Sequence, residues 1–465
     1  MDMAGRTAAG AVGRTGRSRF CSGWGYRVLS AAWLVAAASA MAVLLRVGIV
    51  IPAVLAYALR SRRNRISSAR ARPTPTRRRV AVVIPAYNEA AVIGKTLTSL
   101  AACRPAPDEV VVVDDGSTDA TAVVAQSYGP GLPQLTVIIQ ANRGKAGALN
   151  TAIAATSAEV LVVVDAGTVI APDALGELTA PFADPTVGAV AGNLKVGNRR
   201  HPLTALQAVE YVATLNVDRR AQELFGTIAV VPGPAGAFRR AALDQVGGYP
   251  ADTIVEDADL TQALLQARWR IHYAAGAVVH TEAPQTLRDV VRQRRRWSYG
   301  TIQVAAKRAA NPFDHRCGRA GLLALPWLVA SQLLLPVFGP LADLWAIGSL
   351  ATGQLGIVTF TLLVAIVLDL GLTVAAVAID RERWNLVALI PAVHLIWRPL
   401  LLVVVTRSAA TWLSGRTQTW QKITRYATVD LLPKPITTDD STPTGTTPAT
   451  STTPPRPPRG SSPEA

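Results

Sequence analysis

The sequence predicts an α/β domain with a doubly covered, mostly parallel β-sheet, flanked by transmembrane helices. Three observations support this prediction. Residues 79–300 alternate short runs of β-branched residues with helical patterns, apolar stretches lie on both sides of that region, and arginines crowd around the first of these stretches. Apolar runs bounded by turn residues and separated by helices are typical of a parallel sheet that helices cover on both faces.

Composition restricts the class of partner. Half of the 465 residues are hydrophobic, and 47 basic against 31 acidic residues give a formal charge of +16. Such a charge fits nucleic acid, anionic lipid or an anionic substrate. Because the basic residues border apolar stretches and no platform of aromatic and basic residues appears between them, nucleic acid is disfavoured. Cys21, Cys103 and Cys317 are too scattered for a disulfide framework or a zinc site, which suits a reduced cytoplasmic interior.

The first apolar stretch, residues 28–59, is long enough to cross a bilayer, whose hydrocarbon core takes about 20 helical residues. Arg46 inside it leaves open one long span or a pair of short ones. No small-residue cleavage site follows a short apolar core, so we interpret the stretch as an anchor. It lies between a basic segment at 1–27 and a more strongly basic linker at 60–78, which places the following domain in the cytoplasm.

The chain after the α/β region also has a membrane pattern. Residues 301–318 are interpreted as an interfacial segment, and residues 319–406 contain three apolar stretches with tryptophans near their ends. Residues 407–435 alternate cations with aromatic residues, which predicts an amphipathic helix on the membrane surface. The Thr/Pro/Ser-rich residues 436–465 cannot form a core and are predicted to be disordered.

Two charged residues fall inside the predicted spans. Asp369 and Arg398 lie within apolar runs, and a charge in the hydrocarbon region is costly. They are expected to face a polar cavity such as a polymer channel. The alternative is that each lies closer to the membrane interface.

Polar clusters follow the first four β-branched runs of the α/β region. The clusters are Tyr87-Asn88-Glu89, Asp114-Asp115-Gly116-Ser117, Asn142-Arg143-Gly144-Lys145 and Asp165-Ala166-Gly167-Thr168. Ligands of open α/β sheets bind beyond the carboxyl ends of strands, so the four clusters predict one site. Each cluster alone also fits a turn or a helix cap. None has the spacing of a P-loop or of G-x-G-x-x-G, which disfavours kinases, nucleoside triphosphatases and dehydrogenases.

A second group of polar residues lies between Thr253 and Gly300. Glu256 and Asp257 stand at the start of an amphipathic helix, and "QRRRW" follows at residues 293–297. The five histidines show no metal-ligand spacing and are assigned no role. An exposed basic helix on the membrane surface would explain Arg294 and Arg295. It does not explain Trp297 beside Gln293.

Together these motifs resemble family 2 inverting glycosyltransferases of the GT-A fold, in their membrane-embedded, processive branch. That branch includes synthases of cellulose, hyaluronan and poly-N-acetylglucosamine. The resemblance covers residues 79–300 through "VVIPAYNE", "VVVDDGSTD", "NRGKAGALN", "GPAGAFRRAAL", "GGYP", "VEDADL" and "QRRRW". The membrane segments occur in the same order, and "TWQKITR" resembles the W-x-K-x-x-R ending of the poly-N-acetylglucosamine synthase group.

The resemblance implies a role for each matching residue. On the donor side, it assigns Ala86, Tyr87 and Glu89 to the uridine pocket, Asp115 to the base, Lys145 to the diphosphate, Asp165 to the ribose or a metal, and Arg296 to the pyrophosphate. It makes Asp257 the catalytic base, which needs added basicity from neighbours such as Glu256 because a helix start stabilises the ionised form. On the acceptor side it assigns Gln293 and Trp297.

The chain departs from the family in its metal motif. The family's Asp-x-Asp motif has a second carboxylate that ligates a divalent cation, and this position is Gly167 here. Magnesium often takes only one or two carboxylates together with phosphates. Asp165 with the donor is therefore expected to hold Mg²⁺ or Mn²⁺.

The resemblance thus predicts a multi-pass protein of the cell membrane with a cytoplasmic catalytic domain. Its expected activity is transfer of a sugar from a UDP-sugar to a growing β-linked polysaccharide, with inversion and with export of the product. The expected partners are the UDP-sugar donor, the glycan acceptor, membrane lipid and accessory export proteins, with no nucleic acid. Two alternatives stay open: a single-transfer enzyme acting on a lipid acceptor, and a degenerate domain that binds nucleotide sugars as the partner of another synthase.

Overall fold

The computed structural model describes residues 33, 37–41, 44, 48–57, 59, 78–132, 135–308, 320–353, 356–419 and 422–429. The expectations for residues 1–27, for most of 60–78 and for 436–465 lie outside the described residues, as do Cys21, Cys317 and His315. The first predicted membrane stretch is described in part, including a short apolar helix at Gly48–Tyr57.

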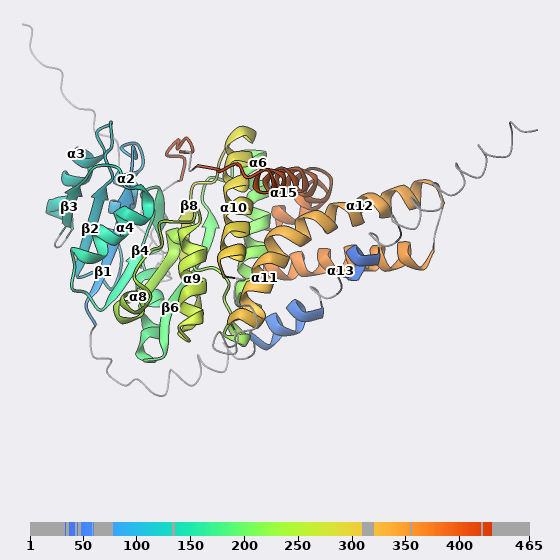
Figure 1. Cartoon of the computed structure of the whole chain (residues 1–465), viewed down its shortest axis with the longest axis horizontal. Coiled ribbons are helices and arrows are strands. Elements are labelled where there is room, and N and C mark those ends of the chain that lie inside the picture. Colours follow the sequence, from blue (N-terminus) through green and yellow to red (C-terminus); the bar gives the residue numbers. More distant parts are fainter. Residues whose placement is uncertain are drawn as a thin grey trace, which may run out of the picture. The chain divides into compact units, whose positions relative to one another are not determined.

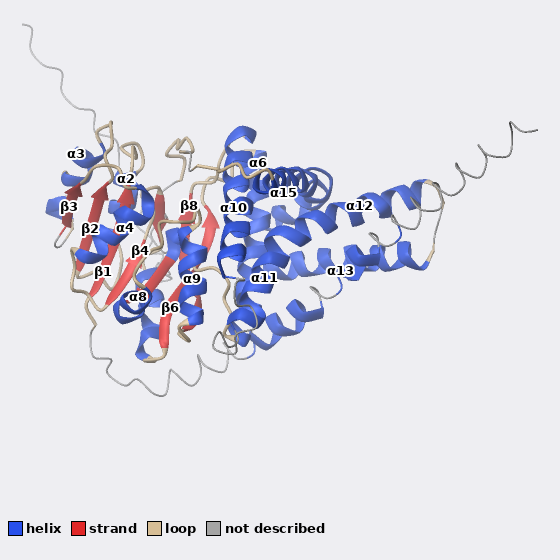
Figure 2. Cartoon of the chain, viewed as in Figure 1, coloured by secondary structure: helices blue, strands red, loops and turns tan. Residues whose placement is uncertain are grey.

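An eight-stranded sheet forms the centre of the α/β region (Figures 1 and 2). Its order is β3-β2-β1-β4-β7-β6-β8-β5. The strands are β1 (Val80–Ala86), β2 (Glu109–Asp114), β3 (Leu135–Ile139), β4 (Val160–Val163), β5 (Thr168–Ile170), β6 (Val187–Val196), β7 (Gly236–Arg239) and β8 (Arg270–Thr281).

The sheet is mixed and mostly parallel. Strands β3, β2, β1 and β4 run parallel to one another, and β6 runs parallel to β8. Strand β7 pairs antiparallel with both β4 and β6, and β5 pairs antiparallel with β8. Strands β1, β2, β3 and β4 are formed by the β-branched runs that predicted a parallel sheet, and the polar clusters lie at or after the ends of these strands. The predicted α/β fold class is confirmed, with the antiparallel pairings as an addition.

Helices cover both faces of the sheet. The helices of this region are α2 (Ile93–Ala101), α3 (Thr121–Gln126), α4 (Gly144–Ala154), α5 (Ala174–Thr179), α6 (Pro202–Glu210), the π-helical η3 (Tyr211–Asn216), α7 (Val217–Phe225), α8 (Arg240–Val246), α9 (Glu256–Gln266) and α10 (Leu287–Arg308), of which α10 packs on other helices rather than on the sheet. Ala81 and Val83 of β1 pack into one core cluster with residues of α4 and α9. Val82 and Ile84, which point to the opposite face, are also fully buried, so β1 is covered on both sides.

Three apolar helices follow α10, as the sequence predicts. The candidate membrane spans are Leu322–Ala351, Thr359–Ile379 and Trp384–Leu413. They are built from η6 (Ala320–Ala324), α11 (Leu325–Val329), η7 (Ala330–Leu334), α12 (Leu335–Ala351), α13 (Ile357–Ile379), η8 (Trp384–Leu389), α14 (Ile390–Ala392), η9 (Val393–Trp397) and α15 (Arg398–Leu413). Only 22%, 39% and 17% of their apolar windows are buried inside the protein, which suggests that lipid covers the rest.

The charged residues inside these helices pair with one another. Arg398 of α15 forms ion pairs with Asp369 of α13 and with Asp343 of α12, the latter at 3.2 Å. His394 Nδ1 lies 3.0 Å from Asp343 Oδ1. These residues therefore supply the polar surroundings that charges in an apolar span require, and they link three helices.

A buried ion network joins the α/β region to the loop after α13. Arg220 of α7 forms an ion pair with Asp380, and both side chains are almost fully buried, at 4% and 1% exposed. Lys195 of β6 lies 2.8 Å from Glu382 and donates to the Asp380 carbonyl at 2.9 Å. Arg199 also pairs with Glu382. The loop is therefore held by charged contacts to the sheet region.

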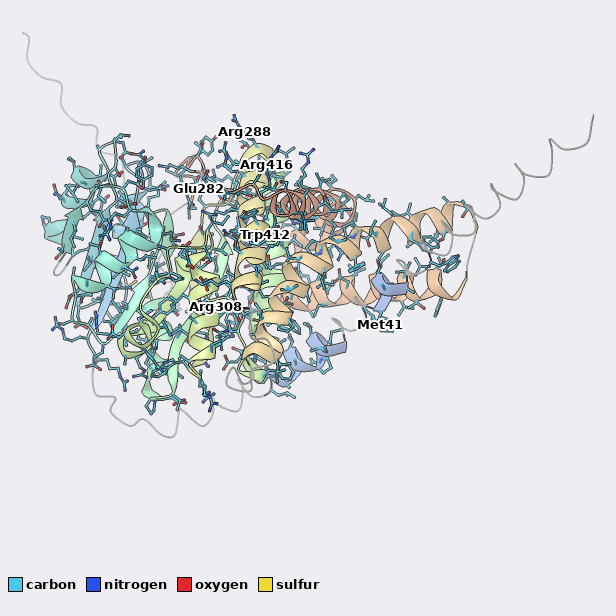
Figure 3. The ribbon with its side chains drawn as sticks, viewed as in Figure 1. Met41, Glu282, Arg288, Arg308, Trp412 and Arg416 are labelled. Carbon is cyan, nitrogen blue, oxygen red and sulfur yellow. The ribbon has the colours of Figure 1, made fainter. Side chains whose placement is uncertain are left out.

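The C-terminal part of the described chain differs from the expected surface helix at 407–435. Helix α15 ends at Leu413, and residues 416–419 and 422–429 have no helical structure. Trp412 and Arg416 lie beside α10, because Tyr299 contacts the Trp412 ring at 5.6 Å between centroids and donates to the Arg416 carbonyl at 3.0 Å (Figure 3). Helix α10 itself continues to Arg308, into the expected interfacial segment. The sequence pattern predicted the basic and aromatic composition but not these protein contacts.

Breaking the Arg220–Asp380 pair should destabilise the protein. Arg220→Met leaves the buried Asp380 carboxylate without its main cation, and removing one partner of a buried ion pair costs about 3–5 kcal/mol. We expect a clearly lower melting temperature in thermal unfolding of the detergent-solubilised protein. The control is Arg270→Met, which breaks an exposed pair with Asp184 and should cost at most about 1 kcal/mol. Equal effects of the two variants would contradict the role given to the buried pair.

Candidate active site

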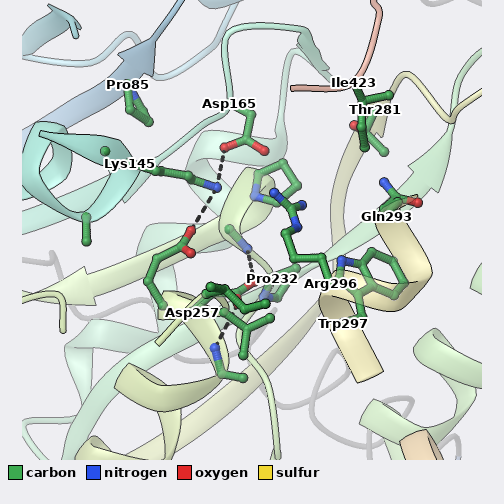
Figure 4. Close-up of a pocket in the computed structure, with 18 of the residues that line it drawn as sticks. Pro85, Lys145, Asp165, Pro232, Asp257, Thr281, Gln293, Arg296, Trp297 and Ile423 are labelled. Atoms are coloured by element: carbon green, nitrogen blue, oxygen red, sulfur yellow. Dashed lines mark hydrogen bonds and ion pairs between the residues drawn. The ribbon is translucent and has the colours of Figure 1, made fainter. Parts of the chain in front are cut away.

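One cavity of about 570 Å³ lies at the carboxyl ends of the parallel strands. It is lined by residues at or after the ends of β1, β2 and β4, by the starts of α4 and α9, by one face of α10, and by Lys422, Ile423 and Arg425 (Figure 4). The structure brings all ten residues predicted for the site into this lining: Ala86, Tyr87, Glu89, Asp115, Lys145, Asp165, Asp257, Gln293, Arg296 and Trp297.

Asp115 is fixed at one end of the cavity by backbone and side-chain donors. Its Oδ1 accepts hydrogen bonds from Gln140 Nε2 at 2.7 Å and from the Arg143 N–H at 2.8 Å. Gly116 follows with a φ of +77°, and an added Cβ would lie 3.0 Å from the Asn142 nitrogen. A residue with a side chain would therefore be strained there, so the glycine of "DDGS" permits the close turn that orients Asp115.

Lys145 bridges two acidic residues of the cavity (Figure 4). Its Nζ lies 2.9 Å from Asp165 Oδ1 and 3.2 Å from Glu256 Oε1. Burial alone would raise the pKa of Asp165, but Lys145, Arg425 and Arg296 together hold that pKa below its usual value. Burial works against the charge of Lys145, yet Asp165, Glu256 and Asp257 raise its pKa. The ammonium and the Asp165 carboxylate are therefore both charged at neutral pH.

Asp257 is the second residue of α9. Its Oδ1 accepts from the Ala258 N–H at 2.8 Å, and its Oδ2 accepts from the Gly233 N–H at 3.3 Å. Burial and the neighbouring Glu256 carboxylate raise the pKa of Asp257, against the lowering effect of Lys145 and of these two N–H groups. The environment therefore makes this carboxylate more basic than an ordinary aspartate, and burial contributes more than Glu256, the cause expected from the sequence.

Gly233 was missed in the sequence analysis. An added Cβ at this position would lie 2.9 Å from Lys145 Nζ and 3.7 Å from Asp257 Oδ2. The glycine thus leaves the space in which the ammonium and the carboxylate approach each other. The motif "GPAGAF" contained it, but its position could not be deduced without the fold.

Helix α10 presents three of its side chains to the cavity. Gln293, Arg296 and Trp297 lie three and four residues apart, so they share one face of the helix. Within the described part of the chain, the buried Gln293 Oε1 has no hydrogen-bond partner, so it can accept from a bound hydroxyl.

Arg294 points away from that face, into the protein. It is 3% exposed, pairs with Glu210 at 2.6 Å and places its guanidinium 4.0 Å from the centre of the Trp297 ring. The alternative of an exposed basic helix is therefore wrong for Arg294. Its guanidinium instead packs against the Trp297 ring in a cation–π contact. Arg295 is half-buried and donates to Thr411 Oγ1 of α15 at 3.4 Å.

Lys422, Ile423 and Arg425 line the cavity, whereas the sequence pattern predicted that they lie on the membrane surface. Lys422 Nζ donates to the Tyr87 carbonyl at 2.9 Å and also to the Asn88 carbonyl. Arg425 Nη1 donates to the Glu282 carbonyl at 3.0 Å. "TWQKITR" was the available signal, but alternating cations and aromatic residues also fit a lipid surface. Because Lys422 and Tyr87 are far apart in the chain, no local sequence pattern indicates that they are in contact.

The cavity offers a divalent metal little protein coordination. Groups of three or more His, Cys, Asp or Glu side chains with metal-binding geometry are absent from the described residues. Asp165 has Gly167 in place of a second carboxylate and is already paired with Lys145. The site fits a metal that takes Asp165 as its protein ligand and further oxygens from a bound phosphate ligand.

Comparison with known proteins matches residues 76–300 to the family described as "Glycosyltransferase like family 2". The poly-beta-1,6-N-acetyl-D-glucosamine synthases of Staphylococcus aureus (strain COL) and Staphylococcus epidermidis (strain ATCC 35984) are each 31% identical over 226 residues, which is 48% of this chain and 55% of theirs. The chain therefore spans about half the length of the curated relatives it matches. The mannosyltransferase PcManGT from Pyrobaculum calidifontis, solved in complex with GDP-Man and Mn²⁺, has a TM-score of 0.51 and 25% identity, over 82% of this chain and all of that one.

The contact of Glu282 with residues 426–428 should hold the C-terminal segment on the cavity. Glu282 Oε1 accepts from the Tyr426 N–H at 3.0 Å, the Thr428 N–H at 3.3 Å and Thr428 Oγ1 at 2.7 Å. Glu282→Ala removes all three, so we expect faster trypsin cleavage after Lys422 and Arg425, measured by mass spectrometry. Glu159→Ala, at a side chain 65% exposed, is the control. Unchanged cleavage in Glu282→Ala would show that other contacts hold the segment.

Proposed function

We propose that the protein is a membrane-bound polysaccharide synthase, on the basis that residues 76–300 match the family described as "Glycosyltransferase like family 2" and resemble poly-beta-1,6-N-acetyl-D-glucosamine synthases. It transfers a sugar from a UDP-sugar to a growing β-linked glycan with inversion, and it passes the product across the membrane. The domain at 79–300 is cytoplasmic, and the helices within 319–406 make the protein multi-pass. Accessory export proteins are expected partners.

The main support for this proposal is that one cavity contains a carboxylate of raised pKa, Asp257, together with two cations, Lys145 and Arg296. Transfer from a nucleotide sugar needs a group that accepts a proton from the acceptor hydroxyl and cations that stabilise the departing diphosphate. The arrangement supplies both.

In the proposed mechanism, Asp115 and the residues after β1 hold the uridine, and Lys145 and Arg296 hold the diphosphate. Arginine suits phosphate because its planar guanidinium donates two parallel hydrogen bonds. Gln293 and the flat ring of Trp297 position the acceptor sugar. Asp257 takes the proton of the acceptor hydroxyl, and that oxygen attacks the anomeric carbon from the face opposite the UDP. A Mg²⁺ or Mn²⁺ ion bound by Asp165 and the donor phosphates would neutralise charge on the leaving group.

The membrane helices support the link to export. Leu328 of α11 and Gln332 of η7 line the same cavity as Trp297, and both belong to the candidate span Leu322–Ala351. A sugar bound at Trp297 therefore lies next to a membrane segment. A glycan that grows there has a short path into the bilayer region.

One experiment tests the activity directly. Membranes that contain the full chain are offered labelled UDP-sugars one at a time, and the product is sized. We expect long glycan from one donor. A single added sugar on a lipid would favour the single-transfer alternative, and no hydrolysis or transfer with any UDP-sugar would favour a degenerate nucleotide-sugar-binding domain.

Asp257→Asn should retain donor binding but lose transfer, because an amide cannot accept the proton. General-base catalysis contributes about 10²- to 10⁴-fold in rate, so we expect a loss of that order in turnover with UDP affinity unchanged. Asp252→Asn, at a side chain 64% exposed and close to the start of α9, is the control. Near-normal turnover of Asp257→Asn would exclude Asp257 as the base.

The same assignment predicts a pH dependence. Transfer needs ionised Asp257, so activity should fall as the pH drops through its raised pKa, above the value of about 3.9 for an ordinary aspartate. Glu256→Gln removes one cause of that rise and should move the acidic limb of the kcat profile to lower pH. An acidic limb that stays in place in this variant would contradict the electrostatic link between the two residues.

Trp297→Ala should reduce polymer formation more than UDP binding, since the ring is proposed to contact the acceptor. Turnover with labelled donor and equilibrium binding of UDP are measured on the same preparation. Trp384→Ala, at a side chain 62% exposed, controls for loss of an aromatic residue. Equal loss of both properties in Trp297→Ala would indicate a purely structural role.

A further inference from the structure

Gly167 stands at the position where the family's Asp-x-Asp motif has its second carboxylate, and the structure places a cation against it. A Cβ atom at position 167 would lie 3.4 Å from Nη1 and 3.5 Å from Cζ of Arg425. These are ordinary van der Waals distances. A carboxylate at position 167 would therefore meet this guanidinium.

Arg425 is held in place by the segment that carries it. Lys95 Nζ donates to the carbonyls of Ala427 at 2.6 Å and Val429 at 2.8 Å, and Val429 is buried. Thr428 is bonded to the Glu282 side chain. One N–H of Arg425 donates to the Glu282 carbonyl, and a guanidinium has several more to offer.

The charge of Arg425 acts on the cavity. Burial raises the pKa of Glu89, and Arg425 contributes the largest opposing effect. Together with Lys145 and Arg296, Arg425 lines the space proposed for the donor. Three cations from distant parts of the chain thus line one cavity.

We propose that Arg425 takes the place of the second metal-binding carboxylate of this site: its guanidinium binds the diphosphate of the donor directly, so the protein binds a nucleoside diphosphate equally well with or without a divalent cation at Asp165. This inference rests on the proposed function. Binding of the diphosphate by Arg425 requires a residue without a carboxylate at position 167, because a carboxylate there would pair with Arg425 and make its charge unavailable to the ligand. The tetrahedral oxygens of a phosphate suit the planar donors of arginine.

The test is calorimetric titration of UDP into the detergent-solubilised full chain, in excess EDTA and in excess Mg²⁺ or Mn²⁺. We expect similar affinity of the unmodified protein in both conditions. Arg425→Gln keeps a donor for the Glu282 carbonyl but loses the charge, and it should weaken binding in EDTA by about 10- to 100-fold, the effect of a hydrogen bond to a charged group. Arg416→Gln removes a cation from the same segment outside the cavity lining and should have no effect.

Gly167→Asp provides a second variant that does not remove Arg425. The new carboxylate should pair with the guanidinium, so UDP binding in EDTA should weaken, and Mg²⁺ or Mn²⁺ should restore it. Binding by the unmodified protein only when metal is present would overturn the proposal and leave the proposed function intact. Unchanged affinity of Arg425→Gln in EDTA would also overturn it. Failure of the unmodified protein to bind UDP in any condition would overturn the proposed function as well.

Discussion

The site depends on one electrostatic constraint, which is that three carboxylates are held together in a half-buried cavity. Asp165, Glu256 and Asp257 are brought there by the end of β4 and the start of α9. Charges of like sign in such surroundings are costly unless a cation compensates them. Lys145, from the start of α4, lies within 2.9 Å of Asp165 and 3.2 Å of Glu256. Burial and the neighbouring Glu256 carboxylate nevertheless raise the pKa of Asp257, against the lowering effect of Lys145.

Elements outside the core of the α/β region complete the cavity. Helix α10 brings Arg296 and Trp297, and its position is fixed by the buried Arg294, which pairs with Glu210 and lies 5.5 Å from the ring of Trp397. The chain after α15 brings Lys422 and Arg425, fixed by Tyr87, Asn88 and Glu282. The last cations of the site therefore come from the chain after the three apolar helices, and contacts with the α/β region fix their positions.

Much of this could be predicted from the sequence, for physical reasons. The β-branched runs predicted the parallel strands, and the polar clusters had to meet because parallel strands end at one edge of a sheet. Contacts between segments far apart in the chain could not be predicted. The pattern at 416–429 fits a lipid surface as well as a protein surface, and the burial of Arg294 depends on Glu210, which no local pattern links to it. The antiparallel β7 and β5, of four and three residues, are too short to leave a clear signal.

The central claim is that Asp257 activates an acceptor for a single displacement at the anomeric carbon. The anomeric configuration of the first linkage made from an α-linked UDP-sugar, determined by proton NMR, tests this claim most directly. One displacement from the face opposite UDP inverts the centre, so the account predicts a β-linkage. An α-linkage would contradict it, because a single displacement cannot retain the configuration of the anomeric carbon.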